Sequence, residues 1–242
     1  MFSPTPLTGL RTARAALQPV LKRLLLCVCL VAPLLAGFAF AGTPASPKSG
    51  TGVEPIPATP QHIADLREGG FVIYMRHGAT DARIPDQIPV VLEDCASQRP
   101  LTEAGRTQLD EIGRHFAKLR LPHLLPVSSP FCRAVESARR VFGEPIEVDI
   151  DLRYTAAMPS AEKAPAVVRT RYWVSLPVDE PRTNRVVVAH GPNIAEIMEY
   201  LPREATMVIF RPLGLSAEPS FEYVASIEPA HWPVLLEALG IE

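Results

Sequence analysis

Two short apolar segments of the chain are each followed at once by side chains that could act on a ligand. In the first, an apolar run at residues 71–75 leads into Arg76, His77 and Gly78. Ligands of open α/β sheets bind at the carboxyl ends of the strands, and a glycine lets the backbone approach a ligand closely. The tripeptide therefore has the properties of an anion pocket with a positioned imidazole.

Two later segments supply the same residue types. The sequence Ser-Ser-Pro at residues 128–130 precedes Arg133, which is predicted in the first turn of a helix, and an apolar run at residues 185–189 ends in His190. Arginine is permanently charged and its planar donors fit phosphate oxygens. A neutral imidazole can attack phosphorus while a second imidazole stabilises the transferring group. Together with the first segment, these residues predict binding and cleavage of a phosphomonoester.

The segments that must position these side chains alternate between strand-like and helical patterns, which is typical of an α/β sheet. The run at residues 71–75 is wholly apolar and the run at residues 185–189 contains three consecutive valines, so both indicate central strands that are covered on both faces. Further strands are predicted at residues 124–127, 146–150, 207–210 and 221–227. The strand at residues 124–127 is expected at the edge of the sheet, because it contains a proline.

Helices are predicted between these strands. Thr102 can cap a helix whose apolar residues fall on one stripe and which ends before Pro122. Three more helices are expected at residues 131–142, 161–174 and 229–239. The last of them begins with a proline, which is favourable in the first turn of a helix.

The order of these motifs resembles that of the histidine phosphatase superfamily. Four motifs occur in the family's order over roughly residues 71–210. They are a strand followed by R-H-G-x-T, then L-T-x-x-G-R, then S-S-P-x-x-R-A, and finally a strand followed by H-G. The resemblance implies an α/β fold, a three-layer α/β/α sandwich with a mainly parallel central sheet, as in phosphoglycerate mutase. It also implies that no metal or other cofactor is used, and that a phosphohistidine forms and is resolved by water.

Carried over position by position, the resemblance assigns the catalytic nucleophile to His77 and phosphate binding to Arg76 and Arg133. His190 is expected to bind phosphate and to take part in catalysis, and Thr80 is a further candidate for contact with phosphate. Purely structural roles are the alternative. A buried arginine can be satisfied by an ion pair, and a threonine can stabilise a tight turn.

The resemblance leaves the proton donor open. Many relatives have an asparagine where this chain has Arg83, and the donor segment of the mutase-like branch has no convincing counterpart at residues 149–154. Phytase-like relatives place an aspartate after the second histidine, where this chain has Gly191. Asp81, close to the first motif, and Glu204, just before a late strand, are the candidates to protonate the leaving oxygen.

The N-terminal segment predicts export. Residues 1–41 combine basic residues, an uncharged apolar run and an A-x-A ending, so we expect a signal peptide that is cleaved after Ala41. An uncleaved membrane anchor is the alternative. Residues 42–60 are rich in proline, glycine, serine and threonine and predict a flexible linker, and residues 61–242 then form the phosphatase-like domain.

Charge and cysteine content narrow the function further. Residues 1–41 hold four basic residues and no acidic one, and the rest of the chain holds 20 basic and 26 acidic residues. This balance argues against a protein that grips nucleic acid or an anionic membrane through bulk charge. Cys95 and Cys132 remain after signal cleavage. They could form one disulfide or stay as two free thiols, and their spacing does not indicate a metal site.

The sequence therefore predicts an exported phosphomonoester hydrolase, periplasmic or secreted, without stable membrane insertion after signal cleavage. Its expected partner is a small-molecule phosphomonoester, for which a phosphorylated sugar or an envelope component is the candidate. A catalytically silent module that binds phosphate or other anions, and an envelope interaction protein on the same fold, are the alternatives. His77 favours the enzyme, because a binding module needs no nucleophile. The oligomeric state is not predicted.

Overall fold

A computed structural model of the chain describes residues 52–156 and 158–241. The predicted signal peptide and the first part of the predicted linker lie outside these residues. None of the described helices combines the length and the apolar composition that crossing a membrane requires.

The centre of the described part is a single sheet with the strand order β3-β2-β4-β1-β5-β6. β3, β2, β4 and β1 run parallel, whereas β5 pairs antiparallel with β1, and β6 pairs antiparallel with β5. The strands are β1 (Val72–Arg76), β2 (Val127–Ser128), β3 (Glu147–Val148), β4 (Arg185–Ala189), β5 (Met207–Pro212) and β6 (Phe221–Ile227).

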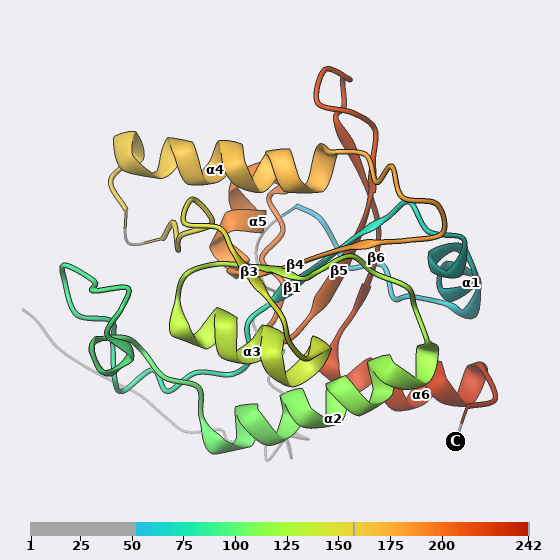
Figure 1. Ribbon diagram of the computed structural model, residues 1–242, viewed down its shortest axis with the longest axis horizontal. Helices are drawn as coiled ribbons and strands as arrows, with labels where there is room; N and C mark the ends of the chain where they lie inside the picture. Colours follow the sequence, from blue (N-terminus) through green and yellow to red (C-terminus); the bar gives the residue numbers. More distant parts are fainter. Residues whose placement is uncertain (1–51, 157, 242) are drawn as a thin grey trace, which may run out of the picture. The chain divides into compact units, whose positions relative to one another are not determined.

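Helices cover both faces of this sheet. Figure 1 shows α4 and α5 on one side of the strands and α2, α3 and α6 on the other. The helices are α1 (Pro60–Glu68), α2 (Glu103–Leu119), α3 (Cys132–Phe142), α4 (Ser160–Ser175), α5 (Gly191–Met198) and α6 (Trp232–Ala238), with 3-10 turns at Cys95–Ser97 and Pro229–His231.

Each face of the sheet has its own apolar core, because successive strand side chains point to opposite faces. In β1, Ile73 and Met75 pack in a cluster with residues of α1, α2, α3 and α6. Val72 and Tyr74 pack instead with residues of α4 and α5. The predicted three-layer α/β/α sandwich with a mainly parallel sheet is therefore confirmed.

Most predicted elements agree with the structure, but the predicted strand at residues 124–127 was wrong in extent and place. β2 contains only Val127 and Ser128, and it lies inside the sheet between β3 and β4. Pro126 is compatible with this interior position because it precedes the paired residues and therefore removes no donor from the ladder. Its carbonyl oxygen instead accepts a hydrogen bond from the Glu147 backbone N–H, at 2.9 Å.

The end of the predicted linker was also wrong. The Ala58 N–H donates to the Ser226 carbonyl at 2.9 Å, and the Ser226 N–H donates to the Ile56 carbonyl at 2.7 Å. Ala58 is buried. Proline is tolerated at a sheet edge, where no ladder donor is needed, so this proline-rich segment packs along β6. The predicted linker at residues 42–60 therefore includes residues that belong to the folded domain.

The start of α2 lies directly against the loop that follows β1. As predicted, Thr102 caps this helix, and its side chain accepts a hydrogen bond from the Gly105 N–H at 2.9 Å. A Cβ atom at Gly105 would stand 2.4 Å from the carbonyl oxygen of Ala79. Glycine at this position is therefore needed for α2 to approach the R-H-G loop closely.

Candidate active site

The carboxyl ends of β1, β4 and β2 lie next to one another, because β4 pairs with both of the other strands. The residues that follow these strands are His77, His190 and Ser129, and they meet at this edge of the sheet. The backbone N–H of His77 donates to the carbonyl of Ala189 at 3.0 Å. The two imidazole rings lie edge to face, with centroids 5.3 Å apart.

Hydrogen bonding determines which nitrogen of His77 is free to react. His77 is buried, and its Nδ1 lies 2.8 Å from the carbonyl oxygen of Gly78. A carbonyl oxygen only accepts hydrogen bonds, so Nδ1 carries the proton and the lone pair is on Nε2. Burial, and next the charge of Arg133, hold the pKa of His77 well below its usual value near 6.5. His77 is therefore a neutral imidazole whose Nε2 is available as a nucleophile.

His190 is fixed by both its backbone and its ring. The Tyr74 hydroxyl donates to the His190 carbonyl at 3.0 Å and accepts from the His190 N–H at 3.1 Å. The ring Nε2 lies 2.7 Å from Ser129 Oγ, whereas Nδ1 has no hydrogen-bond partner among the described residues. Burial, followed by the charge of Arg133, lowers the pKa of His190 well below 6.5. The ring thus retains one unsatisfied nitrogen beside His77.

Arg133 presents an unpaired edge of its guanidinium group in this site. Its side chain is fully buried, and its Nη1 donates to Asp86 Oδ1 at 2.8 Å. Nε and Nη2 have no partner among the described residues. These two nitrogens form one edge of the planar guanidinium, which can donate two parallel hydrogen bonds to a phosphate. Unpaired buried donors are costly, so this edge is a candidate to bind an anion.

Two more arginines lie near the same imidazoles. The charges of Arg76 and Arg99 contribute to the lowered pKa of both His77 and His190. The Nε of each arginine is buried without a partner among the described residues. Arg76 is held by its Nη1, which donates to the Pro202 carbonyl at 2.7 Å. The site therefore concentrates positive charge and unpaired donors around two neutral histidines.

The two predicted proton donors have different surroundings. Glu204 Oε1 accepts a hydrogen bond from Thr80 Oγ1 at 2.8 Å and lies 3.7 Å from Arg76 Nη2, which connects both residues to the site. Asp81 accepts hydrogen bonds from Arg83 at 2.9 and 2.7 Å, and these bonds lower its pKa to about 2. Asp81 is therefore paired with Arg83, whereas Glu204 contacts two residues of the site, and the assignment of the proton donor stays a prediction.

Several residues of the site were missed in the sequence. Arg99 lies in a segment without periodicity. Its position two residues before the L-T motif is the only sequence feature that could have pointed to it. Phe131 and Tyr154 place their rings 5.1 and 5.4 Å from the ring of His190, although Tyr154 belongs to a segment that matched no known donor motif. Asp86 and Ser129 are recognisable only through their contacts with Arg133 and His190.

A disulfide joins Cys95 to Cys132, with Cα atoms 5.7 Å apart. The sequence left these cysteines either bonded or free. Cys132 directly precedes Arg133, and its N–H donates to Gln98 Oε1 at 2.9 Å. The bond therefore ties the loop that carries Arg99 to the start of the helix that carries Arg133.

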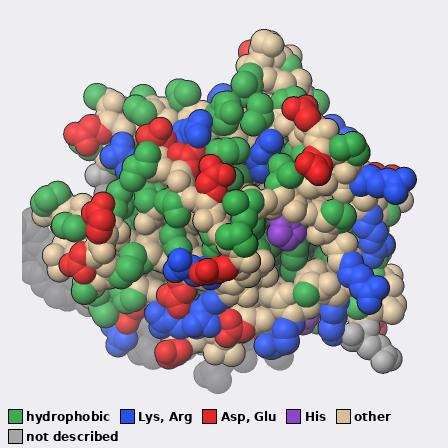
Figure 2. Space-filling model, viewed as in Figure 1, with side chains coloured by type: hydrophobic (Ala, Val, Ile, Leu, Met, Phe, Trp, Pro, Cys, Tyr) green, Lys and Arg blue, Asp and Glu red, His purple; other side chains and the backbone are tan. Residues whose placement is uncertain are grey.

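The helices below the sheet are linked by ion pairs that support α3. Arg106 of α2 contacts Glu136 of α3 at 2.7 Å, and Arg140 of α3 contacts Asp110 of α2 at 2.8 Å. Figure 2 shows basic and acidic side chains next to one another in its lower half, the region of α2 and α3. Among residues 52–156 and 158–241, no three histidine, cysteine or acidic side chains are grouped as metal ligands.

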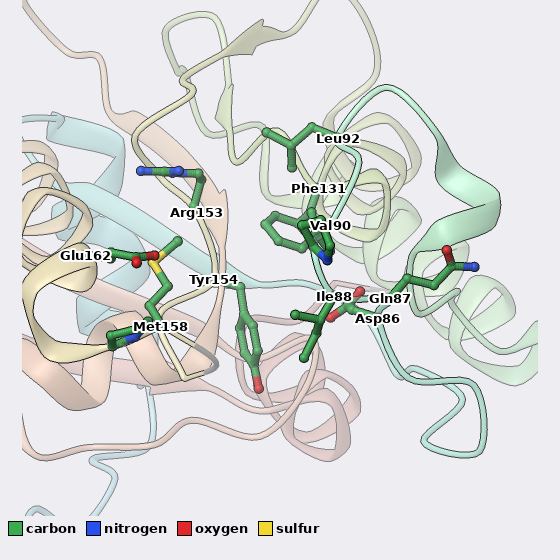
Figure 3. Close-up of a pocket in the computed structure, with 12 residues that line it drawn as sticks. Asp86, Gln87, Ile88, Val90, Leu92, Phe131, Arg153, Tyr154, Met158 and Glu162 are labelled. Carbon is green, nitrogen blue, oxygen red and sulfur yellow. The ribbon is translucent and has the colours of Figure 1, made fainter.

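A cavity of about 510 Å³ is lined by three residues that contact Arg133 or His190. It shares Asp86, Phe131 and Tyr154 with the site, and Figure 3 shows the residues that line it. The remaining lining residues come from two segments that flank this opening, and they are Gln87, Ile88, Pro89, Val90, Leu92, Arg153, Met158, Pro159 and Glu162.

Several solved structures are similar to this chain. A mycobacterial glucosyl-3-phosphoglycerate phosphatase is 23% identical, with 58% of this chain and 89% of that chain covered and a TM-score of 0.41. The protein histidine phosphatase SixA, complexed with tungstate, is 18% identical, with coverages of 66% and 98% and a TM-score of 0.42. A putative alpha-ribazole-5'-P phosphatase from Escherichia coli is 14% identical, with coverages of 66% and 97% and a TM-score of 0.46.

The chain also matches one family model. Residues 72–173 match the model described as histidine phosphatase superfamily (branch 1). No curated protein matches the sequence. The matched range runs from the start of β1 into α4, so it includes Arg76, His77 and Arg133 and ends before His190.

Proposed function

Because residues 72–173 match the model of the histidine phosphatase superfamily (branch 1), we propose that this protein is a phosphomonoester hydrolase in which His77 is transiently phosphorylated. One observation carries the proposal: the unpaired guanidinium edge of Arg133 lies beside a neutral imidazole whose Nε2 is free. The arginine edge suits two phosphoryl oxygens, and the bare nitrogen suits attack on phosphorus.

In the first step, the lone pair of His77 Nε2 attacks phosphorus and the bond from phosphorus to the ester oxygen breaks. The electron pair of that bond goes to the leaving oxygen, which takes a proton from the carboxylic acid of Glu204. Arg133, Arg76 and the free Nδ1 of His190 stabilise the charge on the transferring phosphoryl group.

In the second step, water attacks the phosphohistidine. The P–N bond breaks, its electron pair returns to His77 Nε2, and the Glu204 carboxylate takes up a proton from the water. Free phosphate leaves, and the neutral imidazole and the carboxylic acid are restored. Glu204 is assigned this part because its contacts with Thr80 and Arg76 place its carboxyl group at the site.

We place this activity outside the cytoplasm, in the periplasm or the medium. The N-terminal segment supports this, since it has the pattern of an export signal. The Cys95–Cys132 disulfide supports it independently, because structural disulfides persist mainly in oxidising compartments.

The test compares the protein of residues 42–242 with its His77→Ala variant on an aryl phosphate, from acid to neutral pH and without added metal. We expect phosphate release to fall about 10³-fold or more in the variant, and the acid-labile phosphoenzyme to be lost. His123→Ala is the matched control, because His123 Nδ1 makes the same 2.8 Å contact with the following carbonyl, away from the site. A phosphate release that survives the His77 change would refute the mechanism. Phosphate binding without any turnover would identify a silent anion-binding module.

A further inference from the structure

The cavity shown in Figure 3 is placed to receive the part of a substrate that leaves during the reaction. Asp86, at its wall, contacts Arg133 Nη1 at 2.8 Å, and the ring of Tyr154, another wall residue, lies 5.4 Å from the ring of His190. Because these wall residues contact both Arg133 and His190, the alcohol part of an ester whose phosphate lies between those two side chains would have this space next to it. Its volume of about 510 Å³ is within the range of small-molecule sites.

The walls of the cavity are largely apolar. Aliphatic side chains line it from both segments, namely Ile88, Pro89, Val90, Leu92, Met158 and Pro159, and the rings of Phe131 and Tyr154 complete it. Ile88 is 89% exposed. Removing apolar surface from water is favourable, so an apolar group that fills the cavity would bind with a gain in affinity.

The polar groups of the cavity are few for a ligand with many hydroxyls. Asp86 is already engaged, since its Oδ1 accepts from Arg133 Nη1 and from the Arg99 N–H, both at 2.8 Å. Figure 3 shows the amide of Gln87 pointing away from Tyr154. Glu162, the Tyr154 hydroxyl and Arg153, whose Nε has no partner among the described residues, remain. Each sugar hydroxyl that loses water without a new partner would cost free energy.

We infer that this cavity binds an apolar leaving group, so that the substrate is a phosphomonoester of an apolar alcohol rather than of a polyhydroxylated sugar. The inference rests on the proposed function and narrows its substrate class. It also departs from the phosphorylated sugar expected from the sequence.

The test measures kcat/KM for a series of n-alkyl phosphates and for sugar phosphates of similar size. Burial of one methylene contributes about 0.8 kcal/mol, so each added carbon should raise kcat/KM roughly three- to fourfold until the cavity is full. Sugar phosphates should fall at least about tenfold below the longer alkyl esters, because their hydroxyls lack partners. A flat alkyl series, or a preference for a sugar phosphate, would overturn the inference while leaving the phosphatase itself intact.

A variant pair locates the effect. Ile88→Asn should reduce the gain in kcat/KM per added carbon, since it removes apolar surface from the cavity wall, and the fold should be retained because Ile88 is exposed. Ile84→Asn is the matched control, because Ile84 is 49% exposed on the same loop but does not line the cavity. If kcat/KM rose equally per added carbon in both variants and in the parent protein, the assignment of the cavity would be contradicted. A lack of phosphohistidine with every ester would instead contradict the proposed function, and the inference with it.

Discussion

The carbonyl oxygen of Gly78 decides the chemistry of His77 at the scale of a single residue. It holds the Nδ1 proton, so the reactive lone pair stays on Nε2. Burial and three arginines disfavour a second proton on the ring. The same cations that bind phosphate therefore keep the nucleophile unprotonated before the substrate arrives.

The protonation state of His77 gives a prediction about pH. Because its pKa is lowered, the neutral form should persist well below pH 6.5, and protonation should remove the nucleophile only at lower pH. Long-range ¹H–¹⁵N NMR of histidine-labelled protein at pH 6 should show His77 as the neutral Nδ1–H tautomer. Denatured protein is the control, since its histidines should titrate near 6.5. A folded His77 that titrates at 6.5 or above would be inconsistent with the buried site.

The geometry of Arg133 gives a second prediction at this scale. Lysine keeps the charge but offers a single ammonium group in place of a planar edge with two donors. Arg133→Lys should therefore lower kcat/KM about 10- to 100-fold, as expected for the loss of a charge-assisted hydrogen bond worth about 1.5–3 kcal/mol. Steady-state kinetics on the aryl phosphate measure the effect.

Arg139→Lys is the matched control for this change. Arg139 lies on the same helix, but it is half exposed and pairs with Glu144 instead of facing the histidines. Its replacement should change kcat/KM by less than about twofold. Equal losses in the two variants would mean that Arg133 acts through the stability of α3 rather than through contact with phosphate.

At the scale of elements, the Cys95–Cys132 disulfide holds the loop after β1 against the start of α3. It spans 37 residues, and it lies next to Arg133 and close to Arg99 in the chain. The double variant Cys95→Ser/Cys132→Ser should lose about 2–4 kcal/mol of unfolding free energy. Its KM should also rise, because the two arginines are no longer held at a fixed distance. Urea denaturation and kinetics measure the two effects.

A reducing agent provides the control for this prediction. It should lower the urea midpoint and raise the KM of the parent protein, and it should leave both values of the double variant unchanged. A reductant that weakens the double variant equally would show that its effect does not come from this bond.

At the scale of the whole molecule, the boundary of the folded domain lies earlier than the composition suggests. Residues 56–58 exchange backbone hydrogen bonds with Ser226 of β6, and the Ile56 N–H also donates to the Tyr223 hydroxyl at 2.9 Å. A segment with the composition of a proline-rich tether therefore adds to the edge of the sheet.

This boundary can be tested by truncation. The free energy of unfolding of a protein of residues 60–242 should be about 1–3 kcal/mol lower than that of a protein of residues 49–242, because the shorter protein lacks these hydrogen bonds and the buried Ala58. Chemical denaturation compares the two. A protein of residues 52–242, which retains the contacts, should match the longer form. Equal stability of all three would return the boundary to residue 60.

The sequence by itself determined the α/β class, the central strands and the order of Arg76, His77, Arg133 and His190, and its resemblance to a known family implied the three-layer sandwich. These features are local, because an apolar run followed by a charged motif is visible without knowledge of the fold. It missed α5 because His190 and the two residues after it, Gly191 and Pro192, have the pattern of a turn.

Only the tertiary structure decided the surroundings of these side chains. The loop of residues 81–101 has no periodicity, and its path alone brings Asp86 to Arg133 and joins Cys95 to Cys132. A contact between residues far apart in the chain also distinguishes Glu204, which faces Arg76, from Asp81, which pairs with Arg83 only two residues away. Hydrogen bonds, burial and cavity shape depend on where the chain returns in space, and residue spacing does not encode that.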